Sequence, residues 1–440
     1  MAKTWPHRPM KQMTPPNSST SATLTTFVSW CVCVFFALTL AAPSGYSLGA
    51  GLLLLIGLFV MTRRPDVALT REDRIVMAIF LLMFGVALFI FFYHGNRSRT
   101  LDGPSRYLLS IPILLLLLKV PPRLAYVWAG LIVGAIASAG VSYWQRYGLG
   151  LERAEGFTNA IQFGDIALIL AVLCLAGVFW AGTQGRQARY WRFALLVGAL
   201  AGFYAVVASQ TRGSWLALPA VALLFGVAFL TRQNLKRSLA LCSGLVIAAG
   251  VFFVTVPDNV LVHGYDKAMS DVDKYMQTGD ATTSNGGRLA VWQAAYDNIP
   301  THPFLGWSRA DYQAQLERMV AAKEAPPRVL ELPNTHNNFL ETLVFQGILG
   351  LLAHLALYVV PFWYFCKRFK SPDIAVRTLA VSGASLLVSY FLFSMTQVVF
   401  GHNDGIMFFV VTLVILWACM RHAERAGPLP VDRTSTQYLA

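Results

Sequence analysis

Long apolar runs recur along almost the whole chain, and they constrain its fold more than any other feature. Each run holds roughly 17–25 residues, which as an α-helix crosses a hydrocarbon layer of about 30 Å. The expected fold is therefore an all-α integral membrane protein with about 12 transmembrane helices. The approximate spans are 25–42, 47–61, 75–93, 105–119, 124–143, 162–181, 193–208, 213–230, 239–256, 338–364, 376–399 and 404–420.

The composition and the placement of charge agree with this fold. Hydrophobic residues make up 56% of the 440 residues and charged residues only 13%, which is far from the balance of a soluble domain. Lys and Arg in short loops mark the cytoplasmic side. With both termini inside, most of the 35 Lys and Arg residues fall in cytoplasmic segments. The net charge of +13 is therefore mostly topological and does not indicate nucleic-acid binding.

The spans divide the chain into five segments. We expect a cytoplasmic N-terminal tail over 1–24, nine transmembrane helices over 25–256, a long external loop over 257–337, three transmembrane helices over 338–420 and a cytoplasmic C-terminal tail over 421–440. Amphipathic patterns with Pro and Gly punctuation predict that the loop is mostly helical, with helices over 259–277, 287–298 and 309–323. In the second of these, the apolar stripe that should dock on the membrane domain is Leu289, Trp292, Tyr296 and Ile299.

Arg212 lies in a very short external loop between the seventh and eighth spans. A charge at this place does not serve orientation, and an arginine at membrane depth is costly unless it is paired, snorkels or faces a wet cavity. Its planar guanidinium suits a bidentate contact with phosphate. The backbone N–H groups of Gly213 and Ser214, at the start of the next helix, should point to the same place. The alternative is a snorkelling arginine at the membrane interface.

Arg288 stands at the start of the second predicted loop helix, directly after Gly286 and Gly287. A helix N-terminus offers free backbone N–H groups, and glycines allow a ligand to approach closely. With the adjacent guanidinium, these groups form a reasonable anion site. The alternative is a surface arginine near a capped helix.

His336 occurs in NTHNNFLE, where the external loop enters the tenth span. A neutral imidazole can accept a proton there, and a helix N-terminus favours the neutral form. We expect Asn334 or Thr335 to cap the helix, which places His336 in or near its first turn. The alternative is a histidine that only helps to cap the helix. Glu341, one turn beyond Asn337, either orients this polar cluster or bonds a neighbouring helix.

Weaker candidates enlarge the polar external surface. They are Asp165 at the entry to the sixth span, and Arg97 and Arg99 in the second external loop. Asp271 and Asp273 form a D-x-D pair, but residues two apart on a helix point to different sides, so we expect no metal site there. The sequence contains no motif for zinc hydrolysis or ATP binding, so we expect neither a metal nor another cofactor.

Three motifs occur in an order that resembles a known family. TRGSW begins one span, GGRLAVWQAAYDNIPTHPFLGW lies in the long external loop, and NTHNNFLETLVFQGILG enters the next span. In this order they resemble the O-antigen ligase and polymerase superfamily of bacterial envelope glycosyltransferases. Within it, the chain is most similar to the O-antigen ligases of lipopolysaccharide assembly. The motifs cover roughly residues 157–350, and the pattern of spans extends the resemblance to the whole chain.

The resemblance implies a GT-C-like glycosyltransferase architecture in the bacterial inner membrane, with the long loop and the active site on the periplasmic face. It implies transfer of polysaccharide from undecaprenyl pyrophosphate to a sugar of the lipid A core, among membrane lipids and without a metal, a nucleotide or a nucleic acid. It also implies that His336 is the catalytic base and that Arg212 and Arg288 match the family's two essential arginines. Further substrate-binding residues are expected to be Asn337, Glu341, Gly287, Arg97, Arg99 and Asp165.

The chemistry of these residue types fits the implied reaction. Departure of the pyrophosphate supplies the driving force, so the reaction needs no ATP. Two arginines can bind the diphosphate and stabilise charge as the glycosidic bond breaks, and His336 can take the proton from the acceptor hydroxyl. No residue stands out as a covalent nucleophile, so a single displacement with inversion is expected.

Other functions remain compatible with the sequence. An O-antigen polymerase, or a protein O-oligosaccharyltransferase of the same superfamily, would use the same donor and similar motifs. From another class, about twelve spans can form a multi-span transporter or a lipid flippase. A transporter is expected to carry ionisable residues near the middle of the membrane. Here the main candidates lie at the outer boundary, although Glu341 and His354 keep that function open.

Overall fold

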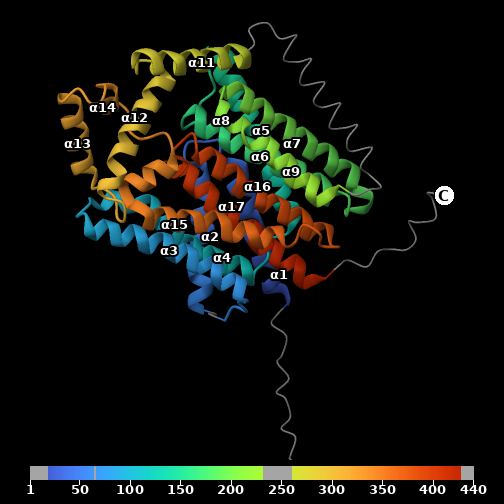
Figure 1. Ribbon diagram of the computed structural model, residues 1–440. Coiled ribbons are helices and arrows are strands. Elements are labelled where there is room, and N and C mark those ends of the chain that lie inside the picture. The colour runs from blue at the N-terminus through green and yellow to red at the C-terminus, as the bar shows by residue number, and fades with distance from the viewer. Residues whose placement is uncertain (1–17, 64–65, 231–259, 428–440) are drawn as a thin grey trace, which may run out of the picture.

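The computed structural model describes residues 18–63, 66–230 and 260–427, and over these residues every regular element is a helix (Figure 1). Long helices pack side by side in a bundle. They are α1 (Ser18–Leu38), α2 (Gly45–Arg63), α3 (Arg71–Tyr93), α4 (Asp102–Lys119), α5 (Leu124–Tyr143), α6 (Ala160–Ala181), α7 (Ala188–Ser209), α9 (Ala217–Phe229), α15 (Asn338–Cys366), α16 (Ile374–Ser394) and α17 (Asn403–Ala426). Between them lie the short helices η1 (Ser98–Leu101), the π-helix η2 (Trp144–Gly148), η3 (Gly185–Gln187), α8 (Arg212–Trp215) and η5 (Val399–Gly401).

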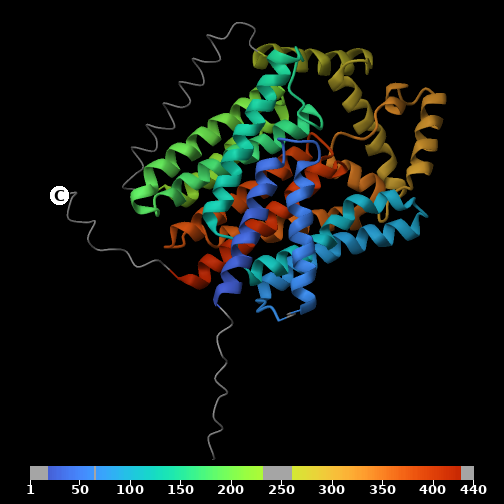
Figure 2. The same ribbon diagram turned by 180° about the vertical axis from the view of Figure 1, so that it is seen from behind.

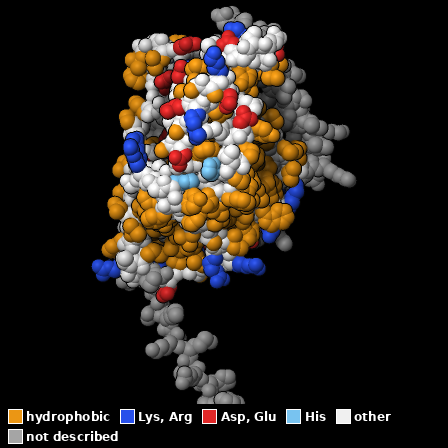
Figure 3. Space-filling model, turned by 60° about the vertical axis from the view of Figure 1, so that its left-hand side comes forward, with side chains coloured by type: hydrophobic (Ala, Val, Ile, Leu, Met, Phe, Trp, Pro, Cys, Tyr) orange, Lys and Arg blue, Asp and Glu red, His pale blue; other side chains and the backbone are white. Residues whose placement is uncertain are grey.

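The predicted all-α membrane fold is confirmed. Within the described residues, ten helical segments are long and apolar enough to cross a membrane, and α1 adds a shorter apolar stretch over Ala22–Leu38. Each predicted span overlaps one of these segments, except the ninth, over 239–256, which lies outside the described residues. The space-filling view shows a broad hydrophobic belt, with charged side chains above and below it (Figure 3). The chain is therefore a multi-pass membrane protein.

Polar residues extend the first and last helices beyond their apolar runs. At the N-terminal end α1 already begins at Ser18, and the Thr26 hydroxyl donates to the Ala22 carbonyl within its first turns. At the C-terminal end α17 continues to Ala426, and Arg421 in its last turns forms an ion pair with Glu424. Helix formation here follows local hydrogen bonds and ion pairs rather than apolarity.

The centre of the bundle is formed by α6, α16 and α17. In their most apolar stretches, 83%, 78% and 78% of the residues are buried, whereas the other membrane helices bury 33–44%. Seen from both sides, α16 and α17 run through the middle of the bundle (Figures 1 and 2). The outer helices therefore have one face left for lipid.

Ion pairs join three helices at one end of the bundle. Arg368, which follows α15, pairs with Glu72 of α3, and its Nε lies 2.7 Å from Oε1 of Glu424 on α17. Arg421 Nε lies 3.4 Å from Oδ1 of the fully buried Asp73. A buried carboxylate needs such partners, so these pairs hold the N-terminal end of α3 against the C-terminal end of α17.

At the other end of the bundle stand four helices, which we call the helical insert. They are α11 (Val260–Thr278), α12 (Ser284–Asn298), α13 (Arg309–Ala321) and α14 (Arg328–Glu331) (Figure 1). They agree with the three predicted loop helices and add the single turn of α14. Side chains of α12, α13 and α14 form a small core of their own, which includes Ala290, Val291, Leu316, Met319 and Val329.

The predicted apolar stripe of α12 is wrong at Tyr296. Tyr296 is 72% exposed, and the buried face of the helix consists of Ala290, Val291, Ala294 and Ala295. The small side chains of this face lie in the core that α12 shares with α13 and α14. Of the predicted stripe, Trp292 reaches the end of the bundle.

A turn that precedes α13 locks the insert to α15. Gly347 has φ 60° and ψ −159°, which kinks α15. At the kink the backbone N–H of Ile348 donates to Pro303 O (2.8 Å), that of Leu349 to Phe304 O (3.3 Å), and that of Trp307 to Val344 O (2.7 Å). We call residues 303–307 together with 344–349 the insert clamp.

Candidate active site

The loop that carries His336 is held in an uncommon backbone conformation. His336 has φ 50°, in the left-handed region that non-glycine residues rarely adopt. Its N–H donates to Asn334 Oδ1 at 2.9 Å, which supports that conformation. Asn337 is the N-cap of α15, because its Oδ1 accepts from the N–H groups of Phe339 (2.9 Å) and Leu340 (3.2 Å). The predicted caps Asn334 and Thr335 are therefore wrong, and His336 lies just outside the helix.

The hydrogen bonds of Gln397 define which nitrogen of His336 accepts a proton. Gln397 Oε1 accepts from the Val398 N–H at 3.1 Å and lies 3.1 Å from His336 Nδ1. Since that oxygen only accepts, Nδ1 carries the hydrogen and Nε2 keeps its lone pair. Gln397 is buried, so the ring is both oriented and fixed in one tautomer.

Two side chains from different elements hold the same loop. Glu341 is only 8% exposed, and its Oε2 accepts from the Thr335 N–H at 3.1 Å, while its Oε1 lies 3.4 Å from Arg309 Nη2. From α12, Trp292 Nε1 donates to the Thr335 carbonyl at 2.7 Å. Glu341 thus does both things expected of it, because it bonds the loop that carries His336 and pairs with Arg309 of the neighbouring helix α13.

Arg288 lies one turn before Trp292 on α12 and is brought towards the histidine by that contact. Burial lowers the pKa of Arg288, and repulsion from Arg153 lowers it further, although a guanidinium remains charged in proteins. Burial also lowers the pKa of His336, and the charges of Arg288 and His402 add to this effect, whereas the bond to Gln397 opposes it. His336 is thus neutral at neutral pH.

Arg212 begins α8 and is exposed, while its neighbours fasten the segment to the bundle. The Thr211 hydroxyl donates to the Ala160 carbonyl at 2.7 Å, and the Ser214 hydroxyl donates to Asp165 Oδ1 at 2.6 Å. A Cβ at Gly213 would lie 2.6 Å from Thr396 Oγ1, so the segment packs directly on the residues next to Gln397. Asp165 therefore helps to hold α8, which Arg212 begins, through Ser214.

Arg153 is a member of this basic group that sequence reasoning passed over. Its Nε donates to the Ser209 carbonyl at 3.1 Å, just before the Arg212 segment. Burial lowers its pKa, the nearby Glu155 and Glu152 oppose that shift, and Arg212 lowers the pKa again. The same signal that pointed to Arg212, an arginine on the side opposite to the topological charges, applies to Arg153. His402 and Gln397 carried no comparable signal.

Together these residues form one basic cluster. Each positive charge lowers the pKa of the next residue: Arg212 acts on Arg153, Arg153 on Arg288, and Arg288 on His336. They come from four separate parts of the chain, so only the fold brings them together. Guanidinium groups close enough to a neutral imidazole to act on its pKa can bind a polyanion such as a diphosphate, and the imidazole can accept a proton next to it.

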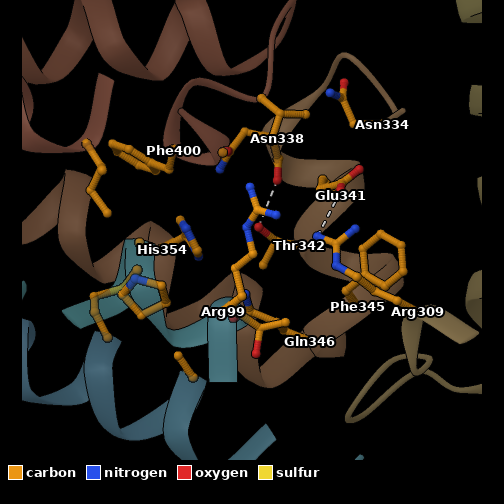
Figure 4. Close-up of a pocket in the computed structure, with 18 of the residues that line it drawn as sticks. Arg99, Arg309, Asn334, Asn338, Glu341, Thr342, Phe345, Gln346, His354 and Phe400 are labelled. Carbon is orange, nitrogen blue, oxygen red and sulfur yellow. Dashed lines mark hydrogen bonds and ion pairs between the residues drawn. The ribbon is translucent and has the colours of Figure 1, made fainter. Parts of the chain in front are cut away.

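The other predicted binding residues lie elsewhere. Gly287 is buried, and a Cβ there would approach Ala281 O and Arg328 Cγ, so its Cα faces the protein itself. Arg97 and Arg99 line a cavity on the α3–α4 side of the His336 loop (Figure 4). Asp271 accepts a hydrogen bond from Asn285 Nδ2 at 3.2 Å. Over the part of the chain that the structure describes, no three His, Cys, Asp or Glu side chains gather as metal ligands.

Comparisons with known proteins point to a membrane enzyme of the glycosyltransferase type. The sequence model of the family described as O-antigen ligase matches residues 197–355, a range that contains Arg212, Arg288 and His336. An O-antigen ligase of Escherichia coli (strain K12) is 24% identical over 196 residues, which are 44% of this chain and 46% of that protein. The chain thus matches less than half the length of that relative.

A second relative covers more of the chain. It is a protein of Haemophilus influenzae (strain Rd) described as uncharacterized, and it is 26% identical over 390 residues, which are 88% of this chain and 96% of the relative. The predicted resemblance to the O-antigen ligase and polymerase superfamily is confirmed by the family match and the Escherichia coli relative.

Proposed function

We propose that this protein is an O-antigen ligase, which transfers polysaccharide from undecaprenyl pyrophosphate to a sugar of the lipid A core. The reaction takes place at the periplasmic face of the bacterial inner membrane, with both termini in the cytoplasm. The observation that carries this proposal is that three segments meet at the His336 loop. Trp292 of the Arg288 helix bonds the Thr335 carbonyl, and Gly213 of the Arg212 segment packs on Thr396, beside the Gln397 that contacts His336. The charges of Arg212, Arg153, Arg288 and His336 act on one another there. The similarity to an O-antigen ligase of Escherichia coli supports it.

The arginines bind the diphosphate of the donor. A guanidinium forms two parallel hydrogen bonds with phosphate oxygens and keeps its charge. Arg212 and Arg288 approach from α8 and α12, and Arg153 lies near both. Negative charge grows on the leaving diphosphate as the glycosidic bond breaks, so the cluster stabilises the transition state more than the bound donor. The arginine charges stabilise the leaving group. Cleavage of the bond between the sugar and the pyrophosphate supplies the driving force, so no nucleotide is needed.

His336 takes the proton of the attacking hydroxyl. The acceptor oxygen forms a bond to the anomeric carbon while the bond from that carbon to the pyrophosphate oxygen breaks, and the electron pair leaves with undecaprenyl pyrophosphate. The proton moves from the acceptor oxygen to Nε2, which is the unprotonated nitrogen because Nδ1–H is held by Gln397. A single displacement inverts the configuration at the anomeric carbon.

In-vitro transfer tests this proposal. Purified protein is given an undecaprenyl-pyrophosphate-linked glycan and lipid A-core, with chelator present. The wild type should form a larger lipopolysaccharide product. His336→Ala should lose about 100-fold or more of the rate, and Arg212→Ala and Arg288→Ala about 10- to 100-fold each. Arg318→Ala is the matched control, because Arg318 is an exposed arginine of α13 outside the cluster.

Wild-type rates in His336→Ala would overturn the proposed mechanism. Glycan transfer by the wild type to a second repeat unit or to a protein, but not to lipid A-core, would instead favour a polymerase or a protein O-oligosaccharyltransferase. Movement of lipid across the bilayer without any new glycosidic bond would favour a flippase.

A further inference from the structure

A large cleft lies beside the His336 loop, on the side of α3 and α4. It consists of two cavities of about 520 and 630 Å³ that share the lining residues Arg97, Thr100, Arg309, Pro333, Asn334, Glu341 and Phe345. Each volume is in the range of known ligand pockets, about 300–1,000 Å³. We call this space the Arg97 cleft. Its walls are residues 94–107, α13 and the chain from 333 to 346.

The cleft carries an excess of positive charge. Arg97, Arg99 and Arg309 line it, and among its described lining residues Glu341 is the only carboxylate. Glu341 is already engaged with the Thr335 N–H and with Arg309. Figure 4 shows the Arg99 guanidinium extending towards Asn338 and Thr342 of α15. The guanidinium groups of Arg97 and Arg99 thus remain to bind an anion.

Asn338 gives a second and independent sign of a ligand. Its side chain is only 3% exposed and lines the smaller cavity, and its Nδ2 has no hydrogen-bond partner among the described residues. Buried amide groups are nearly always paired. The Asn338 Nδ2 group is therefore available to donate a hydrogen bond to an acceptor on a bound ligand. Thr342 and Asn334 add further polar groups to the same wall, and Phe345 and Phe400 add aromatic faces (Figure 4).

The cleft and the basic cluster lie on either side of one loop. Asn334 and Asn338, which flank His336, line the cleft, whereas the His336 ring contacts Gln397 and senses the charge of Arg288. The cleft also reaches Val398, next to Gln397. The cleft is thus lined by direct neighbours of His336 and Gln397, namely Thr335 and Val398, while Arg288 acts on the histidine from α12.

We propose that the Arg97 cleft binds the acceptor as an anionic saccharide, and that Arg97 and Arg99 recognise its phosphate or carboxylate groups. Sugar hydroxyls pair with Asn334, Asn338 and Thr342. This inference rests on the proposed ligase function, because it assigns the acceptor of that reaction to this space. The anionic groups are either phosphates on the sugars or carboxylates of acidic sugars, which offer the same charge to a guanidinium.

Acceptor kinetics and direct binding together test the cleft. The double variant Arg97→Gln/Arg99→Gln should raise the acceptor KM about tenfold, as expected for two screened charge-assisted contacts, while the donor KM stays unchanged. Arg318→Gln, which removes an exposed arginine of α13 outside the cleft, should change neither constant. Three acceptors are compared: intact lipid A-core, its dephosphorylated form, and a form that is dephosphorylated and carboxyl-reduced.

The acceptor series identifies the recognised groups. A penalty that disappears on dephosphorylation assigns them to phosphates, and one that disappears only after carboxyl reduction assigns them to carboxylates. An unchanged acceptor KM in the double variant overturns the inference, as does a penalty of the same size with the neutral acceptor, or a rise in the donor KM instead.

Binding without transfer separates this inference from the proposed function. Isothermal titration of deacylated, phosphorylated core oligosaccharide into the full-length protein needs no donor. Binding that is weakened in the double variant supports the cleft whether or not the wild type transfers glycan. Equal binding by wild type and double variant refutes the cleft, even if the wild type is an active ligase.

Discussion

A single amide oxygen determines how His336 can act. Gln397 Oε1 receives the Val398 N–H and the His336 Nδ1–H, so the proton-accepting lone pair lies on Nε2. The chemistry proposed for His336 therefore depends on a residue far away in sequence that never needs to touch substrate. Gln397 is a positioning residue, in the way that partners of catalytic histidines often are.

The pKa of His336 predicts how the rate depends on pH. Burial, and next the charge of Arg288, lower this pKa below the ordinary value of about 6.5. The neutral imidazole is the active form, so kcat/KM should be full at neutral pH and fall only as pH drops through the lowered pKa of the free enzyme. Arg288→Gln removes one cause of the shift, so the fall in its remaining activity at acid pH, the acid limb of the profile, should begin at a higher pH. The pH profile of kcat/KM measures this.

Arg288→Lys is the matched control for that profile. It keeps the positive charge but loses the bidentate contact with phosphate, so its rate should fall while its acid limb stays where the wild type has it. An acid limb at the same pH in the Arg288→Gln variant and the wild type would mean that Arg288 does not act on His336.

Residue type and position indicated part of the candidate site before the fold was known. Arg212, Arg288 and His336 each stood out alone, and the fold brings all three into one cluster. Arg153 carries the same topological signal as Arg212 but was not selected from the sequence. Gln397 and His402 were not visible, because a glutamine or histidine at a helix end has no pattern that marks it. Their roles come from contacts between distant segments.

The kink in α15 shows how one element can hold another. A helix interior normally excludes foreign backbone, but at Gly347 the turn from Pro303 to Gly306 replaces part of the helical hydrogen bonding. A Cβ on Gly347 would lie 2.3 Å from Phe304 C, and φ there is 60°. Only glycine satisfies both requirements.

Gly347→Ala should therefore destabilise the protein. Backbone strain together with this clash should cost about 2 kcal/mol or more, and thermal unfolding in detergent should occur at a lower Tm. Transfer should fall as well, because the clamp joins the insert, with Arg288, to the helix that follows His336.

Gly85→Ala in α3 is the control for this substitution, since nothing lies within 4 Å of a Cβ at that position. It should leave Tm unchanged or slightly raised. A Gly347→Ala protein as stable as the Gly85→Ala protein would contradict the account of the clamp.

Periodicity predicted the elements of the insert but not their faces. The three loop helices lie where amphipathic pattern and Pro and Gly punctuation indicated them. The stripe of large side chains on α12 nevertheless failed at Tyr296, because Ala290, Ala294 and their neighbours pack more closely than a tyrosine can. Hydrophobicity scales give little weight to small residues, and close packing between helices selects them.

At the level of the whole molecule, membrane physics made the fold class predictable. Backbone groups in hydrocarbon must bond within their own helix, so composition and run length sufficed to predict an all-α bundle. The same information does not reveal which helices are central. That α6, α16 and α17 form the buried centre follows from packing among many segments. The Arg97 cleft likewise exists only where α3, α13 and α15 meet.

The orientation of the bundle predicts a labelling pattern. Short loops rich in Lys and Arg should face the cytoplasm, and the insert should face the periplasm. In a background without the native cysteines, a membrane-impermeant maleimide should label Glu317→Cys on α13 in intact cells. It should label Arg186→Cys in η3 only after the inner membrane is permeabilised. Both side chains are exposed, so access depends on the side of the membrane, and the reverse pattern would invert the orientation.

The insert clamp also restricts how this molecule can be recombined with its relatives. Residues 303–307 and 344–349 are joined by three backbone hydrogen bonds. The missing side chain of Gly306 leaves room for the backbone of residues 344–346, and that of Gly347 leaves room for the backbone of residues 304–305. A chimera that grafts a foreign insert between the same two membrane helices would join halves that never co-evolved. Grafts that fold should carry the first turns of α15 and its kink at Gly347 along with the insert. The segment to exchange therefore includes part of a membrane helix as well as the periplasmic insert.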